Sequence, residues 1–185
     1  MIKPTFLALC GAPGSGKSQV QKILNNHFGC ISVDDGRPVR DMAKIVYGLN
    51  ETQVSTPKGK NELVQLPNGE VLTVREILGN LANQFEKLHG DKWFAQLAID
   101  KCLKSKNNKS LYSFGSVRRN QAWAYKKHNA ICIEVIRPGY TIVNEFDQYC
   151  PDAIDYKIYN TGSIEELKMQ VFKTITKFSL TPKVF

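Results

Sequence analysis

A glycine-rich segment near the start of the chain has the residue types and the spacing of a phosphate-binding loop. Residues 11–18 read GAPGSGKS and match the pattern GxxxxGK followed by Ser or Thr at every fixed position. Glycines let the backbone wrap closely around a phosphate, so that successive N–H groups can point at the anion. A helix that starts at the end of the loop would add the positive end of its dipole. The alternative is a chance glycine-rich turn, which a match over eight residues disfavours.

The side chains of this loop indicate what it could bind. Lys17 is expected to reach the terminal phosphates of ATP, and the Ser18 hydroxyl is expected to hold a Mg²⁺ ion beside them. The expected ATP-binding residues are Gly11, Ala12, Pro13, Gly14, Ser15, Gly16, Lys17 and Ser18. Such a loop does not name a reaction, because kinases, GTPases, motors and DNA-packaging ATPases all carry it.

The elements around the loop predict the fold that positions it. Residues 5–10 form a continuous apolar run that ends at a glycine, as is typical of a strand buried on both faces. Further strands are expected at 30–33, 111–114, 130–136 and 156–159, and helices at 17–28, at 38–47 and around the later strands. This alternation predicts an α/β fold of the P-loop NTPase type, with a mostly parallel sheet of about five strands covered by helices on both faces.

One polar stretch interrupts the alternation of strands and helices. We interpret residues 49–72 as an acceptor-binding insertion on a single domain that spans residues 1–185. Within it, Pro67-Asn68-Gly69 separates two short apolar runs, which predicts a β-hairpin. Helix starts with a capping box are expected at 73–76 and 163–166, where Thr or Ser precedes Glu by three residues.

Composition limits the classes of protein that the chain could belong to. Its 185 residues suffice for one sizeable domain, and 42% hydrophobic residues argue against a disordered or fibrous chain. No apolar run approaches the ~20 residues that span a bilayer, and nothing resembles a signal peptide, so a cytoplasmic protein is expected. The five cysteines form no CxxC pair and are expected to be reduced, while the three histidines lack the spacing of metal ligands.

The net charge suggests an anionic partner. The chain has 25 Lys and Arg against 17 Asp and Glu, a formal charge of +8, which suits a nucleic acid or a phosphorylated small molecule. The basic residues alternate with acidic ones along the chain and form no sustained basic stripe. We therefore expect neither a stable nucleic-acid partner nor a membrane partner, and the oligomeric state, including a homodimer, stays open.

Several motifs follow the phosphate-binding loop in a specific order. They are PVRDMA at 38–43, TVREIL at 73–78, GDKW at 90–93, VR at 117–118, IRPG at 136–139 and NTGSIEEL at 160–167. In this order the sequence resembles the phage-type deoxynucleoside monophosphate kinases, over most of the chain. The resemblance implies transfer of the γ-phosphate of ATP, with Mg²⁺, to a deoxynucleoside 5′-monophosphate, in the host cytoplasm if a phage encodes the protein.

Five arginines are candidate phosphate ligands in this interpretation. Two phosphorylated ligands carry several negative charges, and Arg binds phosphate oxygens bidentately without titrating. Arg37, Arg40 and Arg75 are expected to bind the acceptor, with a surface ion pair as the alternative for Arg75. Arg118 is expected to stabilise charge on the transferred group, and Arg137 to lie against the base or phosphates of ATP.

Carboxylates are less well placed than in the family that the sequence resembles. That family usually has Asp at the position of Ser116 and Glu near Gln121. Asp34 and Asp35 follow the second strand, at the sheet edge where ligands of open α/β folds bind. One of them is expected to bind a Mg²⁺-coordinated water or to accept the proton of the acceptor, and the alternative for both is a turn or a helix cap.

Three other functions stay open from the sequence alone. The chain could be another small-molecule P-loop kinase, a nucleic-acid-associated ATPase, or a nucleotide-binding relative without turnover, the last because of Ser116 and Gln121. One further residue also has two interpretations. Trp93 is expected either in the core or in the wall of the acceptor site.

Overall fold

The computed structural model describes residues 5–105, 110–178 and 180 of the chain. Two compact units are formed, one by the chain up to Asp35 together with the chain from Ala95 onward, the other by Gly36–Phe94. The single domain expected from the sequence therefore stays a prediction.

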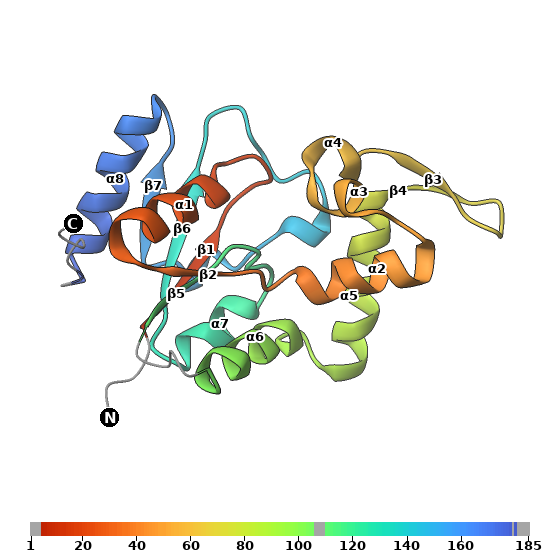
Figure 1. Cartoon of the computed structure of the whole chain (residues 1–185), viewed down its shortest axis with the longest axis horizontal. Helices are drawn as coiled ribbons and strands as arrows, with labels where there is room; N and C mark the ends of the chain where they lie inside the picture. The colour runs from red at the N-terminus through yellow and green to blue at the C-terminus, as the bar shows by residue number, and fades with distance from the viewer. Residues whose placement is uncertain (1–4, 106–109, 179, 181–185) are drawn as a thin grey trace. The chain divides into compact units, whose positions relative to one another are not determined.

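A parallel sheet is the centre of the first unit (Figure 1). Its strands are β1 (Thr5–Cys10), β2 (Ile31–Val33), β5 (Leu111–Phe114), β6 (Ile131–Ile136) and β7 (Tyr156–Tyr159). They lie in the order β2-β5-β1-β6-β7, and every neighbouring pair is parallel. The α/β class and the five-stranded parallel sheet predicted from the sequence are confirmed. All five strands thus end at the same edge of the sheet, which is where the loops that follow them lie.

Helices cover both faces of this sheet, as predicted. One face packs against α1 (Lys17–Phe28) and α8 (Ile164–Thr176) through a core that includes Leu9, Leu24 and Val171. The other face packs against α7 (Gln121–Lys126) and the part of α6 (Trp93–Leu103) that belongs to this unit. Two 3₁₀ helices lie between β6 and β7, η1 (Glu145–Asp147) and η2 (Pro151–Ala153). The central strand β1 is buried along nearly its whole length because both layers pack on it.

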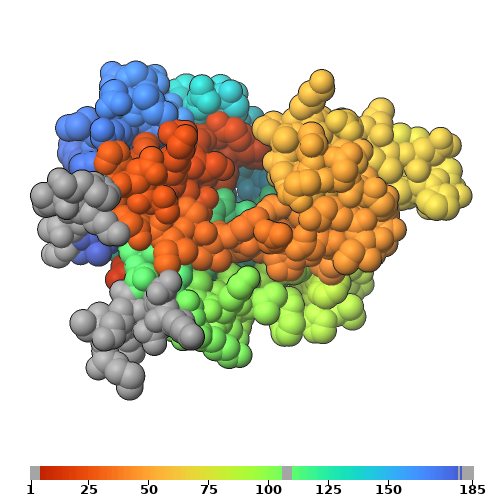
Figure 2. Space-filling view, viewed as in Figure 1, coloured from red at the N-terminus to blue at the C-terminus, as the bar shows by residue number. Residues whose placement is uncertain are grey.

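The second unit combines helices with a two-stranded hairpin. Its helices are α2 (Arg37–Tyr47), α3 (Glu51–Ser55), α4 (Pro57–Lys60) and α5 (Val74–His89), and its strands are β3 (Leu63–Gln65) and β4 (Val71–Thr73). The strands pair antiparallel, and the Leu66 N–H donates to the Glu70 carbonyl at 2.8 Å to close the turn. The hairpin projects from its unit in the space-filling view (Figure 2). Two of its apolar side chains, Leu63 and Val71, are exposed.

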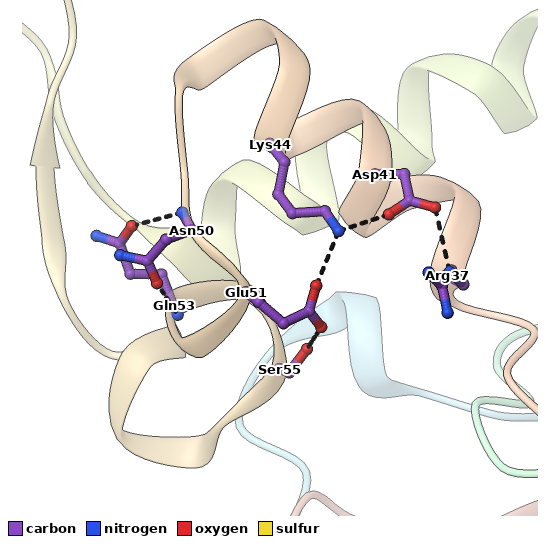
Figure 3. A network of polar contacts seen from close by, with 7 residues as sticks. All are labelled: Arg37, Asp41, Lys44, Asn50, Glu51, Gln53 and Ser55. Carbon is purple, nitrogen blue, oxygen red and sulfur yellow. Dashed lines mark hydrogen bonds and ion pairs between the residues drawn. The ribbon is translucent and has the colours of Figure 1, made fainter.

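Polar contacts join α2 to α3 within the second unit (Figure 3). Lys44 Nζ lies 2.7 Å from Asp41 Oδ1 and 2.8 Å from Glu51 Oε2. Asn50 caps α3 in a reciprocal capping box with Gln53. The hydrogen bonds of Lys44 hold the pKa of Asp41 and of Glu51 below their usual values. Because these side chains are 27–68% exposed, the ion pairs add little to the stability of the unit.

Two other expectations concern the chain as a whole. All five cysteines lie among the described residues and are unpaired thiols, four of them buried, and burial raises the pKa of Cys30 and of Cys102 to about 11. In the described ranges, no helix is both long enough and apolar enough to cross a bilayer.

Candidate active site

The GAPGSGKS loop connects the buried strand β1 to helix α1 in the first unit. The Ser15 N–H donates to the Ala12 carbonyl at 3.1 Å, which closes a turn inside the loop. Helix α1 begins at Lys17, directly after Gly16 in a left-handed conformation with φ of 108°. The Lys17 ammonium donates to the carbonyls of Gly11 at 2.7 Å and of Ala12 at 2.9 Å. The lysine therefore folds back over the loop, with its charge at the loop's own backbone.

Two glycines of the loop are required by close contacts. A Cβ atom on Gly11 would lie 2.3 Å from the Val135 carbonyl oxygen of β6, and one on Gly16 would lie 2.5 Å from Asn160 Nδ2. Both residues also have positive φ, 135° and 108°, which side chains other than glycine rarely adopt. The loop is thus fitted to the ends of β6 and β7 as well as to its own turn.

The loop contains one buried polar atom without a partner. Ser15 is 1% exposed, and its Oγ has no hydrogen-bond partner within the described part of the chain. A buried hydroxyl in this state costs about 1–3 kcal/mol. A polar ligand or a water molecule would satisfy it. This atom is consistent with a loop that is completed by a bound group.

A magnesium ion would fit the exposed start of α1. Ser18, the expected ligand, is exposed in the first turn of the helix. No group of three or more His, Cys, Asp or Glu side chains among the described residues could hold a metal by itself. A hydroxyl with phosphate and water oxygens is the type of ligand set that Mg²⁺ uses beside a nucleotide.

The two aspartates after β2 differ in their surroundings. Asp34 is exposed. Asp35 is 5% exposed, and its Oδ1 accepts from the Ser116 N–H at 3.0 Å while its Oδ2 accepts from the Tyr125 hydroxyl at 3.1 Å. Burial raises the pKa of Asp35, and the hydrogen bond from Tyr125 partly offsets this effect. Asp35 therefore joins the end of β2 to the loop after β5 and to α7.

The loop after β5 places Arg118 at the same sheet edge. The Arg118 N–H donates to Gln121 Oε1 at 3.2 Å, and its guanidinium Nη2 lies 3.2 Å from Asp147 Oδ1. The Asp147 side chain is 6% exposed, against 36% for Arg118. Next to it, Arg119 has φ of 44°, and its N–H donates to the Gln148 carbonyl at 2.6 Å. The segment around η1 thus holds both arginines.

The end of β6 lies against the phosphate-binding loop. Arg137 Nη1 donates to the Gly14 carbonyl at 3.5 Å, and its guanidinium lies 4.7 Å from the centre of the Tyr140 ring. The Tyr140 N–H donates back to the Arg137 carbonyl at 3.2 Å, across a turn that contains Pro138 and Gly139. A Cβ on Gly14 would lie 2.4 Å from the Tyr140 ring. Arg137 therefore lies beside the loop, and its contact with the base or phosphates of ATP stays a prediction.

The end of β7 contributes Asn160, which the sequence analysis quoted in a motif without giving it a role. Asn160 Nδ2 donates to the Ser15 carbonyl at 2.9 Å, and its backbone N–H donates to the Ile136 carbonyl at 2.7 Å. Asn160 directly follows a parallel strand, so the sheet-edge argument that selected Asp34 and Asp35 applies to it equally. Asp147 and Tyr125 were also missed, and their spacing from their partners in the sequence carried no comparable signal.

The residues expected to bind the acceptor belong to the second unit. Arg37 is paired with Asp41, with Nε 3.4 Å from Oδ2, and its side chain is 68% exposed. Arg75 is partly buried in the first turn of α5. The core interpretation of Trp93 is wrong, because Trp93 is 41% exposed and stacks on His89 with a ring separation of 4.6 Å. For these residues and for Arg40, binding of an acceptor stays a prediction.

Comparison with solved structures gives matches that cover nearly the whole chain. A crystal structure of TT1252 from Thermus thermophilus matches with a TM-score of 0.55 and 15% identity, over 95% of this chain and 98% of that chain. Shikimate kinase from Aquifex aeolicus vf5 matches with a TM-score of 0.44 and 15% identity, over 95% of this chain and 98% of the other. Dephospho-CoA kinase from Campylobacter jejuni has the same TM-score and identity, over 96% of this chain and 98% of the other. At such identities the first match supports a shared fold and no particular activity.

No protein-family model matches the sequence, and a comparison with curated proteins also gives no match.

Proposed function

We propose that this protein is an ATP-dependent kinase that transfers the γ-phosphate to a small phosphorylated acceptor, a deoxynucleoside 5′-monophosphate. The observation that carries the proposal is the GAPGSGKS loop between a buried strand and a helix, with Lys17 folded over its backbone. The choice of acceptor rests on the resemblance of the later motifs to deoxynucleoside monophosphate kinases.

The proposed role of the loop is to hold and orient the donor. Phosphoryl transfer depends mainly on positioning and on neutralising charge, so a few fixed cations and N–H groups supply most of what is needed. When the donor binds, Lys17 would exchange its two backbone carbonyl partners for phosphate oxygens. Ser18 would hold Mg²⁺, which neutralises phosphate charge when bound. Arg137 lies beside Gly14, within reach of a ligand on the loop.

Arg118 and Asp34 are proposed to act on the transferred group and on the acceptor. The buried Asp147 holds the Arg118 guanidinium, which limits the number of conformations that the arginine must lose when it meets a developing charge. Asp34 is exposed and therefore accessible to a ligand, whereas Asp35 is only 5% exposed. We therefore assign the proton-accepting or water-binding role to Asp34 and a positioning role to Asp35.

In the second unit, Arg37, Arg40 and Arg75 are proposed to bind the acceptor's phosphate. Arg75 is supported by its place in the first turn of α5, where helix N–H groups also favour an anion. Arg37 already has a carboxylate partner in Asp41, which an acceptor phosphate would have to replace. Its place at the start of a helix makes Arg75 the leading candidate of the three.

A panel of acceptors tests the proposal. Purified protein with ATP and Mg²⁺ is given dTMP, dGMP, dCMP, dAMP and the ribonucleotides one at a time, and ADP release is followed in a coupled assay. We expect ADP with one or a few deoxynucleoside monophosphates, in equal amount to the diphosphate product, because a transferase must exclude water until the acceptor binds. Turnover with the ribonucleotides alone, or with none of these monophosphates, would contradict the choice of acceptor.

Two controls separate the kinase from the other classes. Single-stranded and duplex DNA are added in place of the acceptor, and stimulated release of free phosphate with a steep salt dependence would contradict the proposal in favour of a DNA-dependent ATPase. Lys17→Ala is expected to lower turnover about a hundredfold or more, because it removes a preorganised charge. Lys22→Ala, at an exposed position on the same helix, is the matched control and should leave turnover unchanged.

A further inference from the structure

Asn160 makes a direct side-chain contact with the phosphate-binding loop. Its side-chain Nδ2 donates to the Ser15 carbonyl at 2.9 Å, across 145 residues of sequence. The same nitrogen would lie 2.5 Å from a Cβ on Gly16, so the amide group rests directly on the glycine backbone. Asn160 is itself fixed, because its backbone N–H donates to the Ile136 carbonyl at the end of β6 at 2.7 Å.

This contact determines the direction of a peptide group in the loop. The Ser15 carbonyl and the Gly16 N–H belong to the same planar trans peptide, in which the two groups point in opposite directions. Because Asn160 holds the Ser15 carbonyl on its own side, the Gly16 N–H points away from Asn160. Gly16 has a positive φ of 108°. Because it is a glycine, it has no side chain that could restrict the rotation of this peptide. A nest for a phosphate requires its N–H groups to keep one direction.

We infer that Asn160 is a positioning residue for phosphate binding, which holds the Ser15–Gly16 peptide so that the Gly16 N–H stays directed at the bound phosphate. The inference rests on the proposed function only in requiring that the loop binds the phosphates of a nucleotide. Asn160 acts through the loop and touches no ligand itself. The amide suits this role because it donates a hydrogen bond without carrying charge, whereas a carboxylate would repel both the Ser15 carbonyl and an approaching anion.

Isothermal titration calorimetry of three variants tests this role. Wild type, Asn160→Ala and Asn160→Asp are titrated at a fixed Mg²⁺ concentration with ATP and with inorganic tripolyphosphate, which has phosphates and no base. We expect Asn160→Ala to weaken the binding of both ligands by the same factor, about five- to tenfold, which corresponds to the loss of one hydrogen bond. Asn160→Asp should weaken both further, because it adds a repulsive charge.

Asn25→Ala is the matched control. Asn25 Nδ2 donates to the Cys30 carbonyl at 2.9 Å, so it makes the same kind of bond at the far end of α1. This variant should lose comparable thermal stability and keep its affinity for both ligands. If Asn160→Ala does not fold, Asn160→Asp, which keeps the shape of the side chain, is measured in its place.

Three results would overturn the inference. Weakened binding of ATP with unchanged binding of tripolyphosphate would place Asn160 at the base. Unchanged binding of both ligands would leave Asn160 a structural role only. A wild-type protein that does not bind tripolyphosphate would have no phosphate nest to position. Failure of every acceptor in the kinase panel, with the affinities changed as expected, would contradict the proposed function and leave this inference intact.

Discussion

Asp34 and Asp35 show how far neighbouring residues of one type can differ. Asp35 accepts hydrogen bonds from Ser116 and Tyr125 in a buried position, and the Ser116 side chain also lowers its pKa. A carboxylate at position 116, as in the family that the sequence resembles, would lie beside Asp35 and repel it. Serine instead donates to it. The departure from the family at Ser116 thus has a local physical reason in the surroundings of Asp35.

Substitution of each aspartate by asparagine should separate chemistry from structure. Asp34→Asn is expected to lower turnover about a hundredfold, the usual effect of losing a group that transfers a proton, and to leave the free energy of unfolding nearly unchanged. Asp35→Asn should affect turnover much less, because Asn can still accept from the Ser116 N–H. Steady-state kinetics with the acceptor identified by the panel measures both. Two variants with near-wild-type turnover would contradict a role for either carboxylate and favour the turn or helix-cap interpretation.

The same Asp35→Asn variant should change how stability depends on pH. Burial raises the pKa of Asp35 above its usual value of 3.8, so the folded protein binds this proton more tightly than the unfolded chain does. Its contribution to stability is therefore largest below that usual value and falls as the pH rises through the raised pKa. Between pH 3.8 and the raised pKa, the free energy of unfolding of the wild type should fall relative to that of Asp35→Asn as the pH rises. Urea unfolding over a pH series measures this difference. A difference independent of pH would mean that folding does not raise the pKa of Asp35.

At the scale of elements, local sequence signals predicted most of the fold. The strands at 111–114 and 156–159 and the helix at 17–28 have the expected bounds, because short runs of β-forming residues mark the strands and a helical pattern marks the helix. The capping boxes at Thr73 and Ser163 are both present. Helices α3 and α4 were not predicted. They have five and four residues, and caps at Asn50 and Thr56 hold them where no periodicity could form.

The two capping boxes offer a matched pair for testing the role of α5. Thr73→Ala and Ser163→Ala each remove an oxygen that accepts from a glutamate N–H, at 3.2 Å and 3.3 Å, and each should cost about 1 kcal/mol of stability. Because Arg75 lies in the first turn of α5, Thr73→Ala alone should also raise the acceptor KM several-fold. Urea unfolding and steady-state kinetics give the two quantities.

The outcome for the pair is informative in either direction. An acceptor KM that changes equally in Thr73→Ala and Ser163→Ala would show that a general loss of stability, and not the start of α5, is responsible.

Low pH should weaken both capping boxes, since hydrogen bonds from Thr73 and Ser163 hold the pKa of Glu76 and of Glu166 below their usual values. Their stabilisation is present above the usual glutamate pKa and is lost as the pH falls through the lowered one.

At the scale of the whole molecule, the parallel strands bring to one sheet edge candidate residues that were selected on different grounds. The phosphate-binding loop was selected by its motif and Arg118 by its match to a family motif, whereas Asp34 and Asp35 were selected because they follow a strand. Their roles in binding stay predictions. Contacts that depend on long connections were not predictable. The segment between β6 and β7 brings Asp147 to Arg118 by a route without regular periodicity, so no sequence pattern indicated the pair.

The division into two compact units leads to a prediction for ligand binding across the chain. The proposed donor residues belong to the first unit and the proposed acceptor residues to Gly36–Phe94. Each ligand should therefore slow amide hydrogen exchange in its own unit. ADP with Mg²⁺ should protect residues 12–18, and the acceptor monophosphate should protect the first turns of α2 and α5. At a ligand concentration of about 100 times Kd, exchange through unfolding should slow by up to about a hundredfold.

Hydrogen exchange followed by mass spectrometry measures this prediction directly. The hairpin β3–β4 carries none of the arginines assigned to the acceptor but lies in the insertion interpreted as acceptor-binding, so protection of its strands by the acceptor would extend the acceptor site to the insertion. Arg75→Ala should abolish protection of α5 by the acceptor, because the Arg75 guanidinium is proposed to bind the acceptor's phosphate. ADP should still protect the phosphate-binding loop in this variant. Protection of the loop by the acceptor, with no change in α2 or α5, would contradict the assignment of Arg37, Arg40 and Arg75. It would then place both ligands on the residues of the first unit, with Lys17, Arg118 and Arg137 as the cations that bind them.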